Sequence, residues 1–435
     1  MNSSTYVYLD NFRGFSKVTF QLKDVNFFVG ENSTGKTSVL ALLNIIFSPH
    51  FWFSQQFNTS EYDFGGFRDI LSASVSKEKE FTVGAYRIQH QKDGKDKCEG
   101  FVASFKDHEG LPLCSFLAVI DGINITAIKL AQVDSYYIGK GEIKDHSQLK
   151  FPEIFSYVEN WKINPSTDFK SIPKQIPQGL GLVPLMQIAN ALDADKNPSK
   201  IEISAFKLPM SLYNMVWLAP IRTRPHRTYD GYGKDFSPEG EHTPFVLRKR
   251  LSSKENVESF ENALKQFGKA SGLFKKVSIH NLGKGAADPF EILVTLASKA
   301  LRIDSVGYGI SQVLPLLVEI LVRPKESWFA IQQPEVHLHP KAQAALGDLL
   351  YQVANNENKR FLIETHSDFT IDRFRMNFRK FDNAKKESQI LFFERYKEGN
   401  RVSMIPILPN GEYGDNQPDQ FRDFFLKEQM NILGI

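Results

Sequence analysis

The chain has 435 residues, of which 42% are hydrophobic and 24% are charged, and its formal net charge is +3. This length and apolar content, with 36 Phe, 14 Tyr and 4 Trp to bury, exclude an intrinsically disordered protein and allow two or three compact lobes. The weak positive charge permits contact with nucleic acid without arguing for it. The two cysteines, Cys98 and Cys114, exclude a disulfide framework and favour a reducing compartment.

The sequence predicts neither an export signal nor a membrane span. The first ten residues, MNSSTYVYLD, have no basic start and no apolar core. The longest apolar run, at 313–322, is interrupted by Pro315 and Glu319 and is too short to cross a bilayer. We therefore expect a cytoplasmic protein without a membrane partner.

The first 50 residues predict strands that lead into a helix. Segments 5–15, 17–22 and 25–29 are rich in β-branched and aromatic residues, as strands are. Residues 37–47, TSVLALLNIIF, have the apolar spacing of a helix. Between the last strand and this helix stands the glycine-containing stretch VGENSTGKTS.

That stretch has the spacing of a phosphate-binding loop. Gly30 and Gly35 allow backbone N–H groups to curl around a β-phosphate, and Lys36 neutralises the β- and γ-oxygens. The Thr37 hydroxyl is the expected Mg²⁺ ligand, and the helix N-terminus adds its dipole. The loop therefore predicts ATP and Mg²⁺ as ligands. We expect the nucleotide to contact Gly30, Glu31, Asn32, Ser33, Thr34, Gly35, Lys36, Thr37 and Ser38.

The middle of the chain changes character. From about 81 to 135 short alternating strands are separated by turn signals, and from about 150 to 212 the pattern is helical and loop-like with many prolines. We interpret 81–212 as an insertion between two parts of one nucleotide-binding head, which are residues 1–80 and 213–435.

The last part of the chain alternates strands with helices, which predicts a parallel sheet covered by helices. Strands are expected at 214–221, 290–297, 328–333 and 360–365. Helices are expected at 253–274, after 307–312, at 340–356 and at 368–378. A hairpin at 389–408 and a final helix at about 418–433 complete the pattern.

Several motifs resemble those of ABC-type ATPase heads related to the SMC, Rad50 and RecF proteins. Segment 9–38, LDNFRGFSKVTFQLKDVNFFVGENSTGKTS, resembles the start of such heads. Segment 305–317, SVGYGISQVLPLL, resembles the signature of the subgroup of OLD (overcoming-lysogenization-defect) ATPases. Segments 328–343 and 360–375 resemble the Walker B and D-loop region and the switch-histidine region, and GEYGDNQPDQFRDFF resembles the subgroup's ending.

The resemblance covers about 1–70 and 213–435, and it implies an α/β fold. This fold is a P-loop ABC-type nucleotide-binding head with a mixed sheet, to which an inserted β/α lobe is added. The resemblance also implies a homo-oligomer in which ATP lies between two heads. The signature residues would face the γ-phosphate held by a second copy, and His366 would be the switch histidine. These signature residues are Gly307, Gly309, Ser311 and Gln312.

The chain departs from this family pattern at the end of one strand. Where the family has a Mg²⁺-binding carboxylate and then a catalytic Glu, this chain has Gln332 and Gln333. An amide is not a useful proton acceptor and carries no charge. Glu335 and Glu364 are candidate substitutes. We expect slow or conditional ATP hydrolysis, with Gln332, Gln333, Glu335 and His366 as catalytic positions and with Gln332 as the second metal-ligand position after Thr37.

Two further stretches leave alternatives open. Glu335, His337 and His339 form a candidate metal site, because alternate residues of an extended segment point the same way, but similar HLHP segments serve the D-loop of the family. Segment 222–250 carries seven Lys or Arg against four acids, so it predicts either a phosphate contact or a solvated loop. Arg13 is expected either near the nucleotide or in a core strand.

The predicted function is an ATPase head that engages a second copy around ATP and regulates a separate nuclease effector in anti-phage defence. The resemblance is to the Septu ATPase subunit, which pairs with an HNH-type nuclease and is sometimes found with retrons. DNA is a possible further partner. The alternatives are a RecF-like repair ATPase, a non-hydrolysing ATP-dependent scaffold, and a metal-dependent hydrolase that uses Glu335, His337 and His339.

Overall fold

The structure is a computed structural model of the chain. It describes residues 3–73, 80–90, 96–132, 135–143, 152–163, 169–172, 176, 179–193, 215–253, 257–381, 386–415 and 417–421. The chain forms two compact units. Unit 1 comprises residues 1–23, 31–214 and 392–404, and unit 2 comprises residues 24–30, 215–391 and 405–435.

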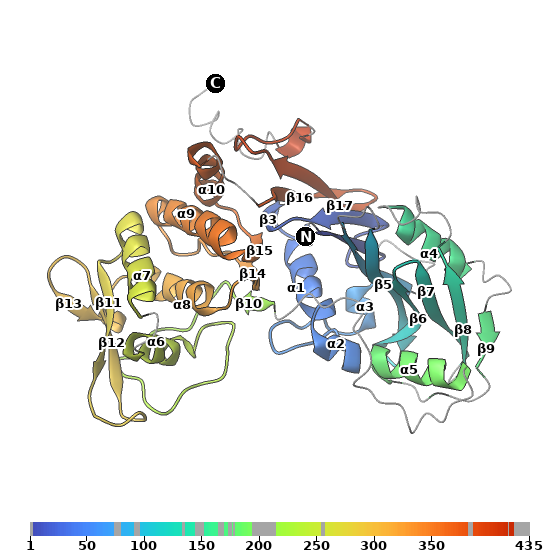
Figure 1. The fold of residues 1–435 in the computed structure, drawn as a ribbon, viewed down its shortest axis with the longest axis horizontal. Helices are drawn as coiled ribbons and strands as arrows, with labels where there is room; N and C mark the ends of the chain where they lie inside the picture. Colours follow the sequence, from blue (N-terminus) through green and yellow to red (C-terminus); the bar gives the residue numbers. More distant parts are fainter. Residues whose placement is uncertain are drawn as a thin grey trace. The chain divides into compact units, whose positions relative to one another are not determined.

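Unit 1 is built on one antiparallel sheet of eight strands in the order β2-β1-β4-β5-β6-β7-β8-β9 (Figure 1). The strands are β1 (Ser3–Asp10), β2 (Val18–Leu22), β4 (Glu80–Gln89), β5 (Lys97–His108), β6 (Leu111–Asp121), β7 (Asn124–Gln132), β8 (Ser135–Glu142) and β9 (Phe169–Ser171). Strands β4 to β9 thus continue the sheet that β1 and β2 begin.

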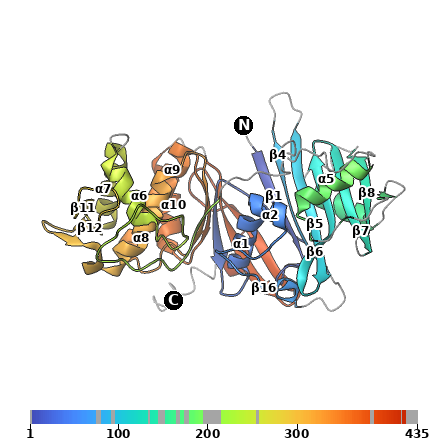
Figure 2. The same ribbon diagram turned by 90° about the horizontal axis from the view of Figure 1, so that it is seen from below.

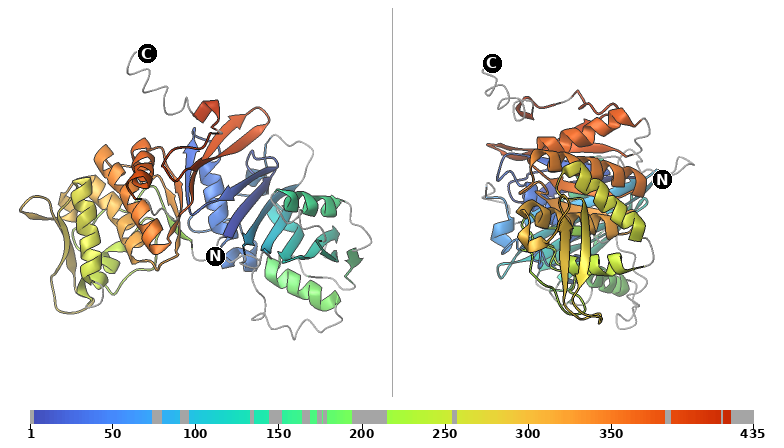
Figure 3. Two further views of the ribbon diagram at one scale, coloured as in Figure 1. Left: turned by 45° about the horizontal axis from the view of Figure 1, so that its top comes forward. Right: turned by 90° about the vertical axis from the view of Figure 1, so that its left-hand side faces the viewer.

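Both faces of this sheet are covered by helices, because successive side chains of a strand point to opposite faces. On one face Phe101 and Phe105 of β5 contact Trp52 and Phe57, with ring centroids 4.7 Å and 4.9 Å apart. On the other face Val102 shares a buried cluster with helix α4. Figure 3 shows the sheet between α4 and α5. The helices of unit 1 are α1 (Lys36–Ile46), α2 (Pro49–Ser54), α3 (Phe67–Ile70), α4 (Glu153–Ile163) and α5 (Leu182–Asp193).

Unit 2 contains four adjacent parallel strands, β10 (Val216–Leu218), β14 (Trp328–Gln332), β15 (Arg360–Glu364) and β3 (Val25–Gly30). They belong to a six-stranded sheet in the order β10-β14-β15-β3-β16-β17. The hairpin of β16 (Ser388–Tyr396) and β17 (Gly399–Ile407) passes through both units. The parallel strands read as continuous apolar runs because both of their faces are buried.

Helices and a small sheet complete unit 2. Figures 1 and 2 show α7, α8 and α9 packed together, with α10 along α9. A three-stranded antiparallel sheet has the order β11-β12-β13. These elements are α6 (Thr243–Ser252), α7 (Val257–Ser271), α8 (Tyr308–Val322), α9 (Pro340–Glu357), α10 (Asp368–Lys380), β11 (Lys276–Asn281), β12 (Phe290–Thr295) and β13 (Ala300–Arg302).

The predicted α/β class with a mixed sheet is confirmed. Strand 214–221 is shorter than predicted, since β10 has three residues. Segment 334–337 is a turn rather than the predicted extended segment, because Gln333, which precedes it, and His337, which ends it, have φ values of 40° and 65°. The final predicted helix lies largely outside the described residues. Among the helices described, none is long and apolar enough to cross a membrane.

Gly347 sets the distance between α9 and α10. A Cβ at this position would lie 2.3 Å from the Thr370 carbonyl oxygen. We expect Gly347→Ala to lower the free energy of unfolding by roughly 1–3 kcal/mol through overpacking, although alanine alone favours a helix. Thermal unfolding measures the change, with exposed Gln352→Ala on the same helix as the control. An increase in stability for Gly347→Ala would contradict this packing.

Candidate nucleotide-binding site

The predicted phosphate loop lies between β3 and α1, as the sequence requires. Gly35 is the N-cap of α1 and has a φ of 92°, which is left-handed backbone that glycine adopts without strain. A Cβ on Gly35 would lie 2.6 Å from the Phe15 ring. No acidic residue stands in the first turn of α1 to compete for its N-terminal N–H groups. The loop therefore fits a polyphosphate.

Side chains within unit 1 hold this loop curled. Lys36 donates to the Glu31 carbonyl at 2.6 Å, and Thr34 Oγ1 donates to the same oxygen at 2.8 Å. Arg395 donates to the Ser33 carbonyl. Lys36 is 4% exposed, whereas Glu31, Asn32 and Ser33 are exposed. Thr37 is half-buried, and Ser38 is buried.

Arg13 supports the loop from the side of α1. Its guanidinium donates to Ser38 Oγ at 3.4 Å, Tyr62 Oη at 3.1 Å and the Phe64 carbonyl at 2.9 Å. Its Nε donates to the Asp69 carbonyl at 3.1 Å. With four acceptors Arg13 links segment 62–69 to the first turn of α1. In this structure Arg13 therefore makes hydrogen bonds within unit 1 and does not belong to a regular core strand.

In unit 2 the predicted strand-end residues lie at the carboxyl edge of the parallel strands. Gln332 of β14 is paired with Glu364 of β15, and Gln332 Nε2 donates to Glu364 Oε2 at 3.5 Å. The Gln333 N–H donates to the Glu364 carbonyl at 2.7 Å. Phe28 of β3 is paired with Glu364 on its other side, so β3 ends at this same edge of the sheet.

The turn after β14 brings Glu335 to the same edge. Its carboxylate accepts from Thr365 Oγ1 at 2.8 Å and from the His366 N–H at 2.7 Å. Burial raises the pKa of the Glu335 carboxyl, the hydrogen bond from His366 opposes this rise, and the neighbouring Glu364 adds to it. The side chain of His366 is exposed. The carboxyl groups of Glu335 and Glu364 thus lie at the edge where this chain has Gln332 and Gln333 in place of the carboxylates of the family pattern that it resembles.

Arg222 is a functional candidate that the sequence did not single out. Its side chain is 2% exposed, and neither Nη1 nor Nη2 has a hydrogen-bond partner among the described residues. Burial lowers its pKa to about 10, while attraction to Glu335 opposes the shift. A buried guanidinium that lacks hydrogen bonds is costly, so this position favours an incoming anion. In the sequence, the only indication of this role was the excess of Lys and Arg over acidic residues in segment 222–250.

The signature segment begins helix α8. Gly307 is the N-cap of α8 and is exposed. A Cβ on Gly309 would lie 2.9 Å from the His337 carbonyl oxygen, so Gly309 allows close approach to the turn after β14. Ser311 is 5% exposed and donates to the Tyr308 carbonyl at 2.8 Å.

Gln312 faces inward from α8 and joins it to the segment after β10. Its Oε1 accepts from the Arg222 N–H at 3.2 Å, and its Nε2 donates to the Arg222 carbonyl at 3.3 Å. Gln312 is 1% exposed, so its carboxamide is engaged inside unit 2 in this structure. The signature helix is therefore connected to Arg222, and through the charge of Arg222 to Glu335.

The structure does not bring Glu335, His337 and His339 together as a metal site. Among the described residues no group of three or more His, Cys, Asp or Glu is placed to hold a metal ion. His337 contacts the Tyr308 ring at 4.8 Å, and the His339 side chain caps α9 by accepting from Ala342 N. The turn at 334–337 separates these side chains.

Two segments of the chain match models of protein families. Residues 5–110, which include the phosphate loop, match a model described as an AAA ATPase domain. Residues 223–372, which include the signature segment, the strand-end glutamines and His366, match a model described as an AAA domain of the AbiEii toxin, type IV TA system. The comparison with curated proteins found no match.

Solved structures of ATPase heads show weak likeness to the whole chain. The SMC head domain from Thermotoga maritima is 11% identical with a TM-score of 0.40, over 92% of this chain and 97% of that one. The Smc head domain of Pyrococcus furiosus bound to the C-terminal domain of ScpA is 10% identical with a TM-score of 0.40, over 100% and 99%. The recombination mediator RecF is 11% identical with a TM-score of 0.31, over 92% and 97%. Likeness at this level does not bear on what this chain binds.

Replacing the Arg222 guanidinium by an apolar side chain should stabilise the protein. We expect Arg222→Met to raise the free energy of unfolding by roughly 1 kcal/mol or more, because a buried charge without hydrogen bonds is removed. Thermal unfolding without nucleotide measures this, and exposed Arg224→Met is the matched control. If Arg222→Met lowers the stability instead, the guanidinium has a stabilising partner and is not available to an anion.

Proposed function

We propose that this chain is an ATP-binding ATPase head that engages a second copy of itself around ATP and hydrolyses ATP slowly. The observation that carries this proposal is the pairing of a complete phosphate loop with amides at both strand-end positions. The loop supplies what binding needs, which is Lys36, a helix N-terminus and glycine backbone. Gln332 and Gln333 withhold the charge and the proton acceptor that fast hydrolysis needs.

The residues present fit a magnesium-bound triphosphate. The Thr37 hydroxyl is the metal-ligand candidate of the loop, and Gln332 is the second metal-ligand position that the family resemblance implies. Mg²⁺, when bound, would neutralise phosphate charge at this site. Lys36 is bonded to the Glu31 carbonyl, and we expect it to exchange that oxygen for a phosphate oxygen.

Glu335 is the proposed proton acceptor for water. Its carboxyl group is held by Thr365 and His366, which fixes its orientation. The raised pKa keeps part of the group protonated at low pH, so only the ionised fraction can accept a proton. Arg222 favours that ionised form, because its charge attracts the carboxylate. The expected consequence is slow hydrolysis whose rate depends on the ionised fraction of Glu335 and therefore on the position of Arg222.

Engagement of a second copy is proposed from the signature segment. Gly307 is exposed at the start of α8, and the N-terminus of a helix attracts an anion such as the γ-phosphate held by the other copy. Gly309 and Ser311 follow in the first turn. Gln312 of the same helix is hydrogen-bonded to the backbone of Arg222, so a movement of α8 on contact with the second copy would move Arg222 relative to Glu335.

The effector is proposed to be a separate nuclease, of the HNH type, in bacterial anti-phage defence, with DNA as a further possible partner. The resemblance of the motifs to ATPase subunits of such systems supports this. The description of the family model matched at 223–372 names a toxin and a TA system, which is consistent with control of a toxic partner. Co-purification from cells that express the neighbouring genes would identify the partner.

Turnover of Mg·ATP, measured together with ATP affinity, tests the proposal. We expect the unaltered chain to bind ATP and turn it over slowly, Lys36→Ala to lose binding, and Gln333→Glu to raise turnover at least about tenfold because it restores a carboxylate. Brisk turnover by the unaltered chain would contradict the proposal. If turnover is undetectable in both the unaltered chain and Gln333→Glu, the protein is a non-hydrolysing scaffold.

The pH dependence of turnover tests the role of Glu335. Because deprotonation creates the proton acceptor and burial raises the pKa of the Glu335 carboxyl, the rate should rise with pH through a value above the ordinary pKa of a glutamate side chain. Glu335→Gln should lose this rise, and turnover should fall by roughly 100-fold. His366→Gln is the control and should keep the rise, because it leaves the backbone N–H that donates to Glu335 in place. A rise that survives in Glu335→Gln would assign it to another group.

A further inference from the structure

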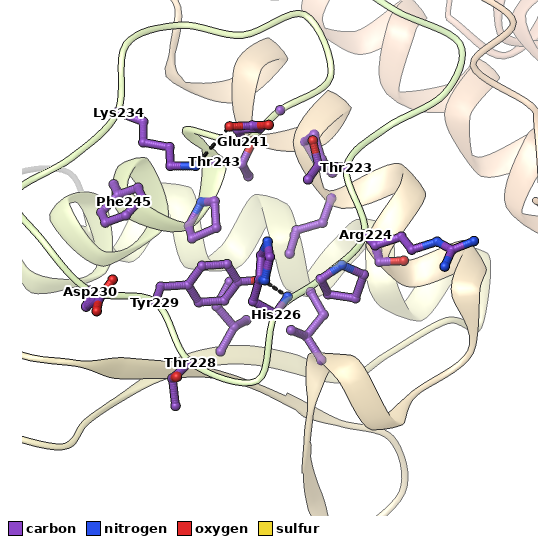
Figure 4. A pocket seen from close by; sticks show the side chains of 18 residues that line it. Thr223, Arg224, His226, Thr228, Tyr229, Asp230, Lys234, Glu241, Thr243 and Phe245 are labelled. Carbon is purple, nitrogen blue, oxygen red and sulfur yellow. Dashed lines mark hydrogen bonds and ion pairs between the residues drawn. The ribbon is translucent and has the colours of Figure 1, made fainter.

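A cavity in unit 2 lies on the flank of the signature helix, and apart from Ser311 its lining residues have no part in the proposed ATPase reaction. Its volume is about 210 Å³, and it lies between segment 223–245 and the 311–315 side of α8 (Figure 4). Its apolar lining includes Pro225, Pro244, Phe245, Leu314 and Pro315. A planar ring of the size of a nucleobase would replace water against such walls with favourable contacts.

The walls of this cavity are held in place before any ligand arrives. The backbone of Tyr229 exchanges two hydrogen bonds of 2.9 Å with Phe290, and Tyr229 Oη accepts from the His226 N–H at 3.0 Å. Gly231 N donates to the Ala287 carbonyl at 3.0 Å. Figure 4 shows the rings of Tyr229 and His226 in the centre of the view, with Lys234 and Arg224 on opposite sides. A preformed aromatic wall reduces the entropy lost on binding.

Polar groups in the wall supply hydrogen bonds that a base could use. Thr223, Thr228 and Asp230 line the cavity with hydroxyl and carboxylate oxygens. Thr243 also lines it, is 3% exposed, and its Oγ1 has no hydrogen-bond partner among the residues that the structure describes. A buried hydroxyl without a partner costs free energy, which a ligand donor or acceptor within reach would recover.

A basic groove adjoins the cavity and shares Lys234 and Phe245 with it. The groove has a volume of about 570 Å³, and none of the described residues that line it is acidic. Lys249 and Lys284 contribute positive charge, and Tyr232 is 90% exposed beside them. Gly231 and Gly233 leave the backbone open to close approach, because an added Cβ at either position would meet nothing within 4 Å, whereas Gly283 and Gly285 pack against the Asp288 carboxylate. Such a groove suits phosphate.

From these two features we propose a second nucleotide site in unit 2, with the base in the cavity and the phosphate in the groove. Lys234 stands at their junction, where it is paired with Glu241 at 2.9 Å on the surface. An exposed pair of this kind is weak, so a phosphate can compete for the lysine. The nucleotide is either a free mononucleotide or one unit of a single-stranded nucleic acid, since both present a base joined to a phosphate.

The site has a direct connection to the signature segment. Ser311, Leu314 and Pro315 line the cavity and belong to α8, the helix that begins at Gly307. Gly240 fits closely against Pro315, where an added Cβ would lie 2.5 Å from the proline Cβ. A bound nucleotide would therefore favour one position of α8 over another, which is how a ligand acts as an effector.

Calorimetric titration of the full-length Lys36→Ala chain tests the site. AMP is the first probe, because it has no β-phosphate for the P-loop, and a twelve-residue oligo-dT is the second. We expect one site per chain, and we expect the double charge reversal Lys249→Glu with Lys284→Glu to weaken binding at least about tenfold. Reversal of the exposed Lys299 elsewhere in unit 2 is the matched control. Thr228→Trp, which should fill the cavity, is a second independent variant.

Saturable binding of AMP would assign the site to a free mononucleotide, and binding of the oligonucleotide alone, weakening steeply with salt, would assign it to a single strand. Absence of binding by both probes overturns the proposal. Binding that is equal in the unreversed chain, the double reversal and Thr228→Trp overturns it as well. Because these titrations use a chain without Lys36, their outcome is independent of whether the protein hydrolyses ATP.

Discussion

The distribution of charge at the carboxyl edge of the parallel strands is the constraint on which the rest of this structure depends. Two amides, Gln332 and Gln333, end β14 at positions where the family pattern that the sequence resembles has a metal-binding carboxylate and a catalytic Glu. The remaining acids, Glu335 and Glu364, are held by backbone and side-chain hydrogen bonds. Nearby Arg222 is buried without hydrogen bonds to its terminal nitrogens. An edge with this arrangement favours the binding of an anion over rapid hydrolysis of a bound nucleotide.

This edge is joined to the signature helix by a short chain of contacts. Gln312 binds both backbone groups of Arg222, and Gly309 allows α8 to approach the turn that carries Glu335. A displacement of α8 would therefore move Arg222 relative to Glu335. Since Arg222 favours the ionised carboxylate, the protonation of Glu335 would change with it. Contact at the signature segment and readiness for hydrolysis are thus expected to be coupled.

The sequence was most informative where the chemistry is local. The strand, loop and helix around residues 25–46 were predictable because the glycine-containing stretch lies between a strand and a helix that are each recognisable from their apolar patterns. The end of β14 at the two glutamines was predictable for the same reason. Confirmation of the α/β class followed from the alternation of apolar strands and amphipathic helices.

What the sequence left undetermined depends on tertiary contacts. The turn after Gln333 places Glu335 next to Thr365. Its backbone has positive φ values at Gln333 and His337, and neither position carries the Gly or Asn that would have predicted such a conformation from the sequence. Arg222 looks like one basic residue among many until its burial is known. Arg13 remained ambiguous because its four acceptors come from segments 25 to 56 residues away.

The central claim is that ATP holds two copies of this chain together. Sedimentation velocity in the presence of Mg·ATP, with ADP and Lys36→Ala as references, tests it most directly. The account predicts that ATP shifts the unaltered chain to a larger assembly that persists through slow turnover. ADP should not produce this shift, and Lys36→Ala should not show it with ATP. An assembly that is the same size with ATP, with ADP and in Lys36→Ala would contradict the claim.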